Sequence, residues 1–273
     1  PTSPIHCDPH QLPYDLRVAT SSPLAARLTA VRQRIADAVS AAGRDPNAIR
    51  LVAVTKYAAP EQIREALALG IGDVGENRVQ QLAQRAAQLG EFHQRRAAAG
   101  EDGYASKLNW HMVGRLQRSN VKALLPHCDL IHSVDSLRLA EEIDAQAGKI
   151  GKVQNILLQV NCSDEDQKGG VAVGAAVPLA ESIASIPNVR LLGLMTMAKL
   201  DAEDDEIRTT FRRLREIFEE MKFENIAGED LRHLSMGMSN DLEHAVAEGS
   251  TMVRVGSDIF GNANDGDDVD GEG

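Results

Sequence analysis

Short apolar runs alternate with helical patterns over most of this chain of 273 residues. Eight of these runs have the length and the β-branched content that are typical of buried parallel strands. The predicted strands cover residues 51–55, 71–75, 109–113, 130–134, 156–160, 189–195, 231–235 and 252–255. Because strands and helices alternate eight times within one domain-sized chain, we predict the α/β class and a single (β/α)8 barrel, the TIM barrel.

The predicted helices carry an apolar stripe at helical spacing. A leading helix covers residues 23–42 and ends at Gly43, and the other helices follow strands. Their patterns lie at residues 63–67, 77–89, 121–125, 136–145, 177–185, 204–221 and 241–247. We expect residues 90–107, which are charged and rich in alanine, to form a solvated insertion before the third strand.

The two ends of the chain differ from this region in composition. Residues 1–22 are rich in proline, serine and histidine, so we expect an irregular extension and place the barrel at residues 23–261. Residues 262–273 are acidic and rich in glycine, which predicts a disordered tail. The tail lacks the glutamate that closes an EF-hand loop, and this disfavours calcium binding there.

Composition limits the classes of partner. Lys and Arg number 29 against 40 Asp and Glu, and the net charge of −11 argues against nucleic acid as the main partner. No apolar stretch reaches the roughly 18 residues of a membrane span, and the polar first residues do not resemble a signal peptide. Three widely spaced cysteines fit neither a disulfide framework nor a zinc site, so we expect a reducing, cytoplasmic location.

Lys56 directly follows the first predicted strand. At the carboxyl end of a barrel strand a lysine can point into a pocket, where the loss of solvent makes its amine a nucleophile for a carbonyl group. The alternative is a lysine that extends its amine into solvent where the strand ends.

Two turns of small residues follow the last two predicted strands. The first holds Ser235, Gly237, Met238 and Ser239, and the second holds Gly256 and Ser257. Barrels often bind phosphate between these two loops, because glycine lets the backbone approach and hydroxyl and N–H groups donate hydrogen bonds. We therefore predict a phosphate site. The alternative is that Ser239 caps a helix and Gly256 serves an ordinary turn.

Arg254 stands among apolar neighbours in the last predicted strand, so it needs a buried anion or acceptor. A phosphate, a ring nitrogen or a carboxylate would serve, and a structural salt bridge is the alternative. A reactive lysine opposite phosphate turns and an arginine fits pyridoxal 5′-phosphate, which combines an aldehyde, a phosphate and a ring.

Other polar and sulfur-containing residues near the strand ends have plainer interpretations. We expect His111 and His132 to be core histidines with hydrogen-bond partners, since their spacing indicates no metal site. Four methionines either flank a flat ring or fill the core. They are Met195, Met197, Met236 and Met238.

Several motifs at the predicted strand ends resemble those of the pyridoxal-phosphate homeostasis protein family. They are Ala53-Val-Thr-Lys56, Gly75-Glu-Asn77, Trp110-His-Met-Val-Gly114 with Leu116-Gln117, Gly193-Leu-Met195, Leu234-Ser-Met-Gly-Met-Ser239 and Gly249-Ser-Thr-Met-Val-Arg-Val-Gly256. The resemblance covers residues 23–261. It implies the barrel of fold-type III pyridoxal-phosphate enzymes, similar to the amino-terminal domain of alanine racemase.

The resemblance also implies roles for residues. Lys56 would form a Schiff base with pyridoxal phosphate, Arg254 would face the ring nitrogen, and Asn77 and Met195 would line the cofactor. The other cofactor-binding residues would be Ser235, Ser239, Gly256 and Ser257 around the phosphate, with Gly237 and Met238 in the same turn. One departure is that Arg118-Ser-Asn120 stands where the family usually has an Asn-Lys pair.

Three functions compete at this stage. The resemblance favours a monomeric carrier and buffer of pyridoxal phosphate in vitamin B6 homeostasis, without established turnover, which exchanges cofactor with apoenzymes. A weak amino-acid racemase is the alternative, but the sequence offers only Tyr14, Tyr57 and Tyr104 as tyrosine acids, and none follows the barrel. A class I aldolase would also use a lysine, generally on a later strand.

Overall fold

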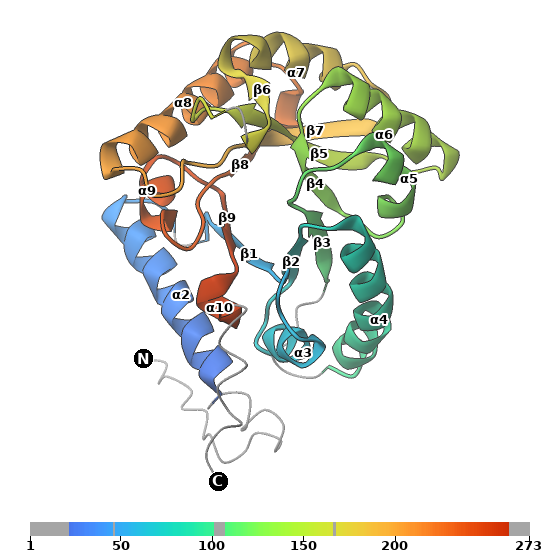
Figure 1. The fold of residues 1–273 in the computed structure, drawn as a ribbon, viewed down its shortest axis with the longest axis vertical. Helices are drawn as coiled ribbons and strands as arrows, with labels where there is room; N and C mark the ends of the chain where they lie inside the picture. Colours follow the sequence, from blue (N-terminus) through green and yellow to red (C-terminus); the bar gives the residue numbers. More distant parts are fainter. Residues whose placement is uncertain (1–21, 46, 101–106, 166–167, 262–273) are drawn as a thin grey trace, which may run out of the picture.

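The computed structural model describes residues 22–45, 47–100, 107–165 and 168–261, which form a closed barrel of parallel strands inside a ring of helices (Figure 1). The eight barrel strands, in spatial order, are β1 (Arg50–Val54), β2 (Asp73–Glu76), β3 (Asn109–Met112), β4 (Leu130–Val134), β5 (Gln154–Asn161), β7 (Val189–Met195), β8 (His233–Ser235) and β9 (Met252–Val255). Pairing of β1 with β9 closes the barrel, with Leu51 opposite Val253. The predicted fold class is therefore confirmed.

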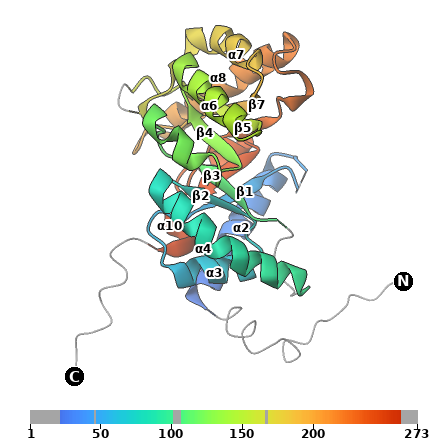
Figure 2. The same cartoon turned by 90° about the vertical axis from the view of Figure 1, so that its right-hand side faces the viewer.

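The helices cover the outside of the strands, as the side view also shows (Figure 2). They are α2 (Pro23–Ala41), α3 (Pro60–Ala68), α4 (Val79–Ala98), α5 (Val121–Leu124), α6 (Leu137–Lys149), α7 (Ala176–Ala184), α8 (Asp204–Phe223), α9 (Leu242–Ala247) and α10 (Ser257–Phe260). The short 3-10 helices are η2 (Arg118–Asn120), η4 (Val173–Ala175) and η5 (Gly228–Asp230). None of the helices in the described ranges has the length and apolar character needed to cross a bilayer.

Strand alternation divides the core in two. Successive side chains of a strand point to opposite faces, so Val253 and Val255 of β9 pack outward under the helices. Met252 instead joins a small cluster inside the barrel. The interior cluster consists of Leu130, Leu157, Leu192, Met195 and Met252. Arg254 shares the inward alternation of Met252 and is likewise buried.

The leading helix α2 packs against both α9 and α10, so the first and last described elements lie side by side (Figure 1). Ser22 caps its start by accepting a hydrogen bond from the Ala25 amide, and Pro23 occupies its first turn, where a missing N–H costs nothing. The rest of the predicted extension, residues 1–21, and the predicted tail, residues 262–273, lie outside the described residues.

The structure differs from the expected elements in several details. The second strand begins two residues later than predicted, at Asp73. The predicted insertion does not begin at residue 90, because α4 continues to Ala98 with Leu89 and His93 buried on one side. A two-residue strand, β6 (Val171–Ala172), pairs with the end of β5 and was not expected. The helical turn α10 after the last strand was not expected either.

Candidate functional site

All barrel strands run parallel, so their carboxyl ends open at one end of the barrel. Four neighbouring strands bring most of the predicted site residues there. β1 leads to Lys56, β2 leads to Asn77, β8 leads to the turn that ends at Ser239, and β9 leads to Ser257. The structure thus gathers these residues on one side of the barrel mouth.

Lys56 lies in a turn and is exposed, so the expectation of a desolvated lysine at the end of a buried strand is wrong. Strand β1 ends at Val54, two residues before Lys56. The alternation of the strand therefore does not direct the Lys56 side chain into the barrel. Its amine lies 4.9 Å from the centre of the Tyr57 ring. Lys56 and Tyr57 form a turn, so the alternation of an extended strand does not separate their side chains.

Arg85 of α4 holds this turn at both sides. Its guanidinium donates to the carbonyl of Thr55 at 2.6 Å and to the carbonyl of Ala58 at 2.8 Å. It also pairs with the Glu76 carboxylate, which accepts a further hydrogen bond from the Thr55 hydroxyl. Glu76 is fully buried at the end of β2. The backbone on both sides of Lys56 is therefore held by hydrogen bonds to Arg85.

Asn77 is exposed just after β2, where its backbone contacts the loop after β3. A Cβ atom on Gly114 would lie 2.3 Å from the Asn77 carbonyl oxygen. Glycine is therefore required at position 114 for the two strand ends to approach each other.

The two predicted phosphate turns lie against each other. The hydroxyl of Ser257 donates to the hydroxyl of Ser239 at 3.2 Å. Arg34 of α2 ties both turns together: it donates to the Ser239 carbonyl at 2.8 Å and pairs with Asp258 at 2.6 Å. A third bond at 2.7 Å joins Arg34 to Glu243. These contacts hold two hydroxyls and the first turn of α10 as one unit.

Gly237 has a backbone conformation that side chains rarely adopt, with φ of +96°. A Cβ atom there would lie 2.6 Å from the Cβ of Ala245 in α9. The carbonyl of Gly237 accepts a hydrogen bond from the Arg254 amide at 2.9 Å, which joins the two turns through the backbone. Met238 is partly buried, and its amide donates to the buried Asp241 carboxylate.

Arg254 is buried inside the barrel, where both of its hydrogen-bond acceptors are neutral. It donates to the Ser235 hydroxyl at 2.6 Å and to the Thr196 carbonyl at 3.0 Å. Burial lowers the pKa of Arg254 to about 10, and the charge of Asp241 acts in the opposite direction. The expectation of a buried acceptor is confirmed. Because the Ser235 hydroxyl is fully buried and engaged here, the structure removes it from the groups that face the phosphate turns.

A chain of polar contacts continues from Ser235 through the barrel interior. Its hydroxyl lies 2.9 Å from His132 Nδ1, and His132 Nε2 lies 2.9 Å from His111 Nδ1. His111 Nε2 lies 2.9 Å from a carboxylate oxygen of Asp73. The expectation of core histidines with hydrogen-bond partners is confirmed.

The methionines differ in their surroundings. Met195 is fully buried in the interior cluster, and Met197 packs against that cluster. Met236 belongs to the outer core under the helices. Met238, which also lies in the phosphate turn, is partly buried. These positions favour core packing for Met195 and Met236.

Sequence reasoning missed several residues that support the site, namely Arg34, Asp73, Arg85 and Asp241. One signal could have found the interior chain. Asp73, His111, His132, Ser235 and Arg254 all occupy inward-facing positions of strand alternation, where a polar residue needs a partner. Arg34 and Arg85 lie on helices, and nothing in their local patterns marks them.

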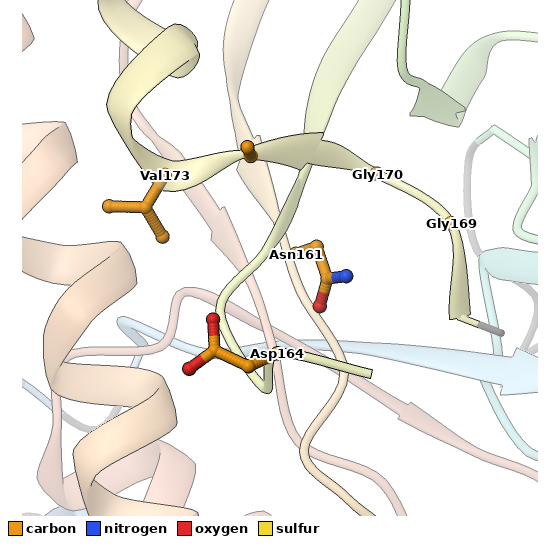
Figure 3. Close-up of a pocket in the computed structure, with 6 residues that line it drawn as sticks. Asn161, Asp164, Gly169, Gly170 and Val173 are labelled. Atoms are coloured by element: carbon orange, nitrogen blue, oxygen red, sulfur yellow. The ribbon is translucent and has the colours of Figure 1, made fainter. Parts of the chain in front are cut away.

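A separate hollow of about 360 Å³ lies at the ends of β5 and β6 (Figure 3). Asn161, Asp164, Gly169, Gly170, Ala172 and Val173 line it. Asp164 pairs with Arg213 at 2.8 Å, and the Asn161 amide donates to the Glu165 carbonyl at 3.0 Å. The hollow contains none of the predicted site residues.

Comparisons with known proteins identify the family of this chain. The family model described as "Alanine racemase, N-terminal domain" matches residues 27–264. The "Pyridoxal phosphate homeostasis protein" of Aquifex aeolicus is 40% identical over 236 residues, which span 86% of this chain and 96% of that protein. The chain belongs to the pyridoxal phosphate homeostasis protein family.

Solved structures place this family member among similar barrels. PipY of Synechococcus elongatus, solved with pyridoxal phosphate bound, is 33% identical with a TM-score of 0.67, and the match covers 83% of this chain and all of that one. The alanine racemase of Clostridium difficile is 13% identical with a TM-score of 0.64, over 88% of this chain and 56% of that one. The second likeness shows a shared fold alone.

Proposed function

We propose that this chain binds pyridoxal 5′-phosphate and acts as a carrier and buffer of that cofactor in vitamin B6 homeostasis. The observation that carries the proposal is the convergence of three groups at the barrel mouth. They are a lysine amine after β1, paired serine hydroxyls after β8 and β9, and a buried arginine in β9. The names of its relatives and the cofactor in PipY support the same assignment.

The donor set fits the cofactor group by group. Ser239, Ser257 and the backbone at Gly256 would bind the phosphate, and the Lys56 amine would take up the aldehyde. Arg254 would face the ring nitrogen, while Asn77 and Met238 would lie beside the ring. Three further residues would support these groups. Met195 would pack behind them, Gly237 would set the shape of the turn, and Ser235 would hold Arg254. The bound cofactor would supply an aldehyde and an electron-withdrawing ring.

A carrier role follows from Arg254 and from the exposed lysine. With a pKa of about 10, Arg254 is cationic at neutral pH and opposes a proton on the ring nitrogen it faces. This weakens the ring as an acceptor of electrons. The exposed Lys56 on a fixed turn can reach cofactor that arrives from solvent, which suits uptake and release.

A weak amino-acid racemase remains the second candidate because of one observation. Tyr57 lies next to Lys56, with the amine 4.9 Å from its ring, and could serve as a second acid or base. It is 67% exposed, however, so nothing in the described residues fixes its hydroxyl opposite the lysine. Tyr14 and Tyr104 lie outside the described residues.

The test is the visible spectrum of the purified protein with pyridoxal phosphate, before and after borohydride. We expect a yellow band that reduction traps, that Lys56→Ala removes, and that Lys149→Ala, an exposed lysine of α6, leaves unchanged. A wild-type protein that stays colourless would contradict the proposal. A band together with D-alanine formed from L-alanine, and lost in Tyr57→Phe, would favour the racemase.

The remaining parts of the proposal concern location and partners. We propose a monomer in the cytoplasm, where the buried free thiols of Cys128 and Cys162 stay reduced. The partners would be apoenzymes that accept pyridoxal phosphate. The test measures activation of an apoenzyme by the loaded protein, either mixed directly or separated by a dialysis membrane. Activation only on direct mixing would indicate transfer by contact. Equal activation through the membrane would indicate a simple buffer.

A further inference from the structure

The contacts between Arg254 and Asp73 form a continuous path through the barrel interior. Its members come from five strands: Arg254 from β9, Ser235 from β8, His132 from β4, His111 from β3 and Asp73 from β2. β4 and β8 are not neighbours in the barrel, so the Ser235–His132 contact crosses the interior. Its three steps on the histidine side each measure 2.9 Å.

When both imidazoles are neutral, the carboxylate at the Asp73 end of the path fixes the direction of the hydrogen bonds. A guanidinium can only donate, so the Ser235 oxygen accepts from Arg254 and its hydrogen is free for His132 Nδ1. His132 then carries its proton on Nε2 and donates to His111 Nδ1. His111 in turn carries its proton on Nε2 and donates to Asp73, whose carboxylate can only accept.

If every hydrogen bond ran in the opposite direction, the contact with the Asp73 carboxylate would lack a proton. If His132 donated from Nδ1 to Ser235, His111 would donate from Nδ1 to His132, and a neutral His111 would present an unprotonated nitrogen to the Asp73 carboxylate. Two lone pairs 2.9 Å apart repel, so this direction needs a cationic His111. With neutral imidazoles, one arrangement therefore satisfies every contact.

Burial keeps His132 neutral, because it lowers the pKa of this ring well below the usual value. The positive charges of Arg254 and Arg50 act in the same direction. The main negative charge on the path is Asp73, which accepts from Asn109 and lies 3.7 Å from Arg50. Burial raises the pKa of Asp73, but the hydrogen bond to His111 and the charge of Arg50 outweigh it. The net shift of this pKa is therefore downward.

We infer that His132, His111 and Asp73 are positioning residues for Arg254. They lock the Ser235 hydroxyl as a donor to His132, which leaves its oxygen as the acceptor that holds the guanidinium against Thr196. The aligned hydrogen bonds also point their negative ends toward Arg254 and so stabilise its charge without a carboxylate beside it. The role of Arg254 toward the ring rests on the proposed function, but the direction of the path does not.

The first test needs no cofactor. Nitrogen-15 NMR of the histidine rings in the apoprotein at pH 7 reports which nitrogen carries the proton. We expect neutral rings with the proton on Nε2 for both His132 and His111. A proton on Nδ1 of either neutral ring, or a cationic ring in either residue, would overturn the inference.

The second test follows cofactor absorbance against pH in Ser235→Ala and Asp73→Asn. Both should shift the midpoint of the spectral transition by at least about one pH unit, because the charge near the ring is no longer held in place. His127→Gln, a histidine outside the path, is the matched control and should leave the midpoint unchanged. Midpoints equal to wild type in both path variants would contradict the positioning role.

The two readouts separate the two proposals. A wild-type protein without an absorbing adduct contradicts the proposed function, while the ring protons still decide the direction of the path. Ser235→Ala keeps the barrel core and Asp73→Asn keeps the side-chain shape, so the failure of one variant to fold leaves the other to decide.

Discussion

Arg85 of α4 and Glu76 of β2 form an ion pair in which the carboxylate is fully buried and the guanidinium side chain is 16% exposed. The same guanidinium brackets the turn that carries Lys56 through two carbonyl groups. The second carboxylate oxygen of Glu76 has no hydrogen-bond partner in the described residues. The pair thus joins the stability of the barrel to the geometry of the turn that carries Lys56.

Removing Arg85 should therefore be costly. Arg85→Met leaves the Glu76 carboxylate buried without a cation, and we expect a loss of about 3–5 kcal/mol in the free energy of unfolding. Urea denaturation measures this loss. Arg95→Met on the same helix removes an exposed ion pair and should change stability by less than about 1 kcal/mol. Equal effects of the two substitutions would show that burial of Glu76 is not the cause.

We expect Arg34 to affect binding of the phosphate group of the cofactor but not binding of its aldehyde. Arg34→Gln releases the Ser239 and Ser257 turns from each other, and we expect roughly tenfold weaker binding of pyridoxal phosphate, or about 1.4 kcal/mol. Binding of pyridoxal, which lacks the phosphate, should change little. Titration of absorbance with both ligands measures the difference, with Arg32→Gln on the same helix as control. A parallel loss for both ligands would place the effect elsewhere than the phosphate turns.

Gly237 should tolerate no side chain. Gly237→Ala places a Cβ atom 2.6 Å from Ala245 in a left-handed backbone conformation, and we expect at least about 2 kcal/mol of destabilisation. The control is Gly90→Ala within α4, where a Cβ meets nothing within 4 Å. That change should stabilise by roughly 0.5–1 kcal/mol because alanine favours helices. Thermal unfolding distinguishes the two, and a neutral Gly237→Ala would refute the steric account.

Stability should fall with acid in a window set by His233. Burial, followed by the charges of Arg50 and Arg232, lowers its pKa to about 4. The unfolded chain binds a proton near pH 6.5, so the stability that neutral His233 contributes is complete above about pH 6.5 and is lost as the pH falls toward 4.

Denaturation between pH 7 and 4 measures this slope. His233→Asn should flatten it, and His127→Asn should leave it as in wild type. The fully buried His132, with its lowered pKa, acts in the same direction and accounts for a residual slope in the variant. An unchanged slope in His233→Asn would assign the acid sensitivity to other groups.

The barrel could be predicted because its signals are local. Apolar runs and turns fix the period of strand and helix, and the strands at residues 189–195 and 252–255 agree residue for residue. The limits of β2 could not be predicted, since the buried Glu76 that ends it is satisfied by Arg85 from the next helix. Residues 90–98 are likewise helical in the structure, where His93 is buried, although their composition predicted a solvated insertion.

In the candidate site, too, features set by local sequence could be predicted and features set by distant contacts could not. The turns around Gly237 and Gly256 follow from small residues at strand ends, and sequence located them. The exposure of Lys56 and the engagement of Ser235 depend on contacts with Arg85, Arg254 and His132, which come from distant parts of the chain. Sequence alone names the residues at the barrel mouth, but it does not tell which of them face the ligand and which hold the others.

The contacts of Arg34 also set an order of events during protein synthesis. Its partners Glu243 and Asp258 lie 209 and 224 positions further along the chain. At 5–20 residues per second, a ribosome needs roughly 10–45 s to deliver them after Arg34 has emerged. Until then α2 lacks the helices that cover its apolar stripe, and the two serine turns are not yet joined. A nascent chain therefore joins its two serine turns only as its last barrel elements leave the exit tunnel.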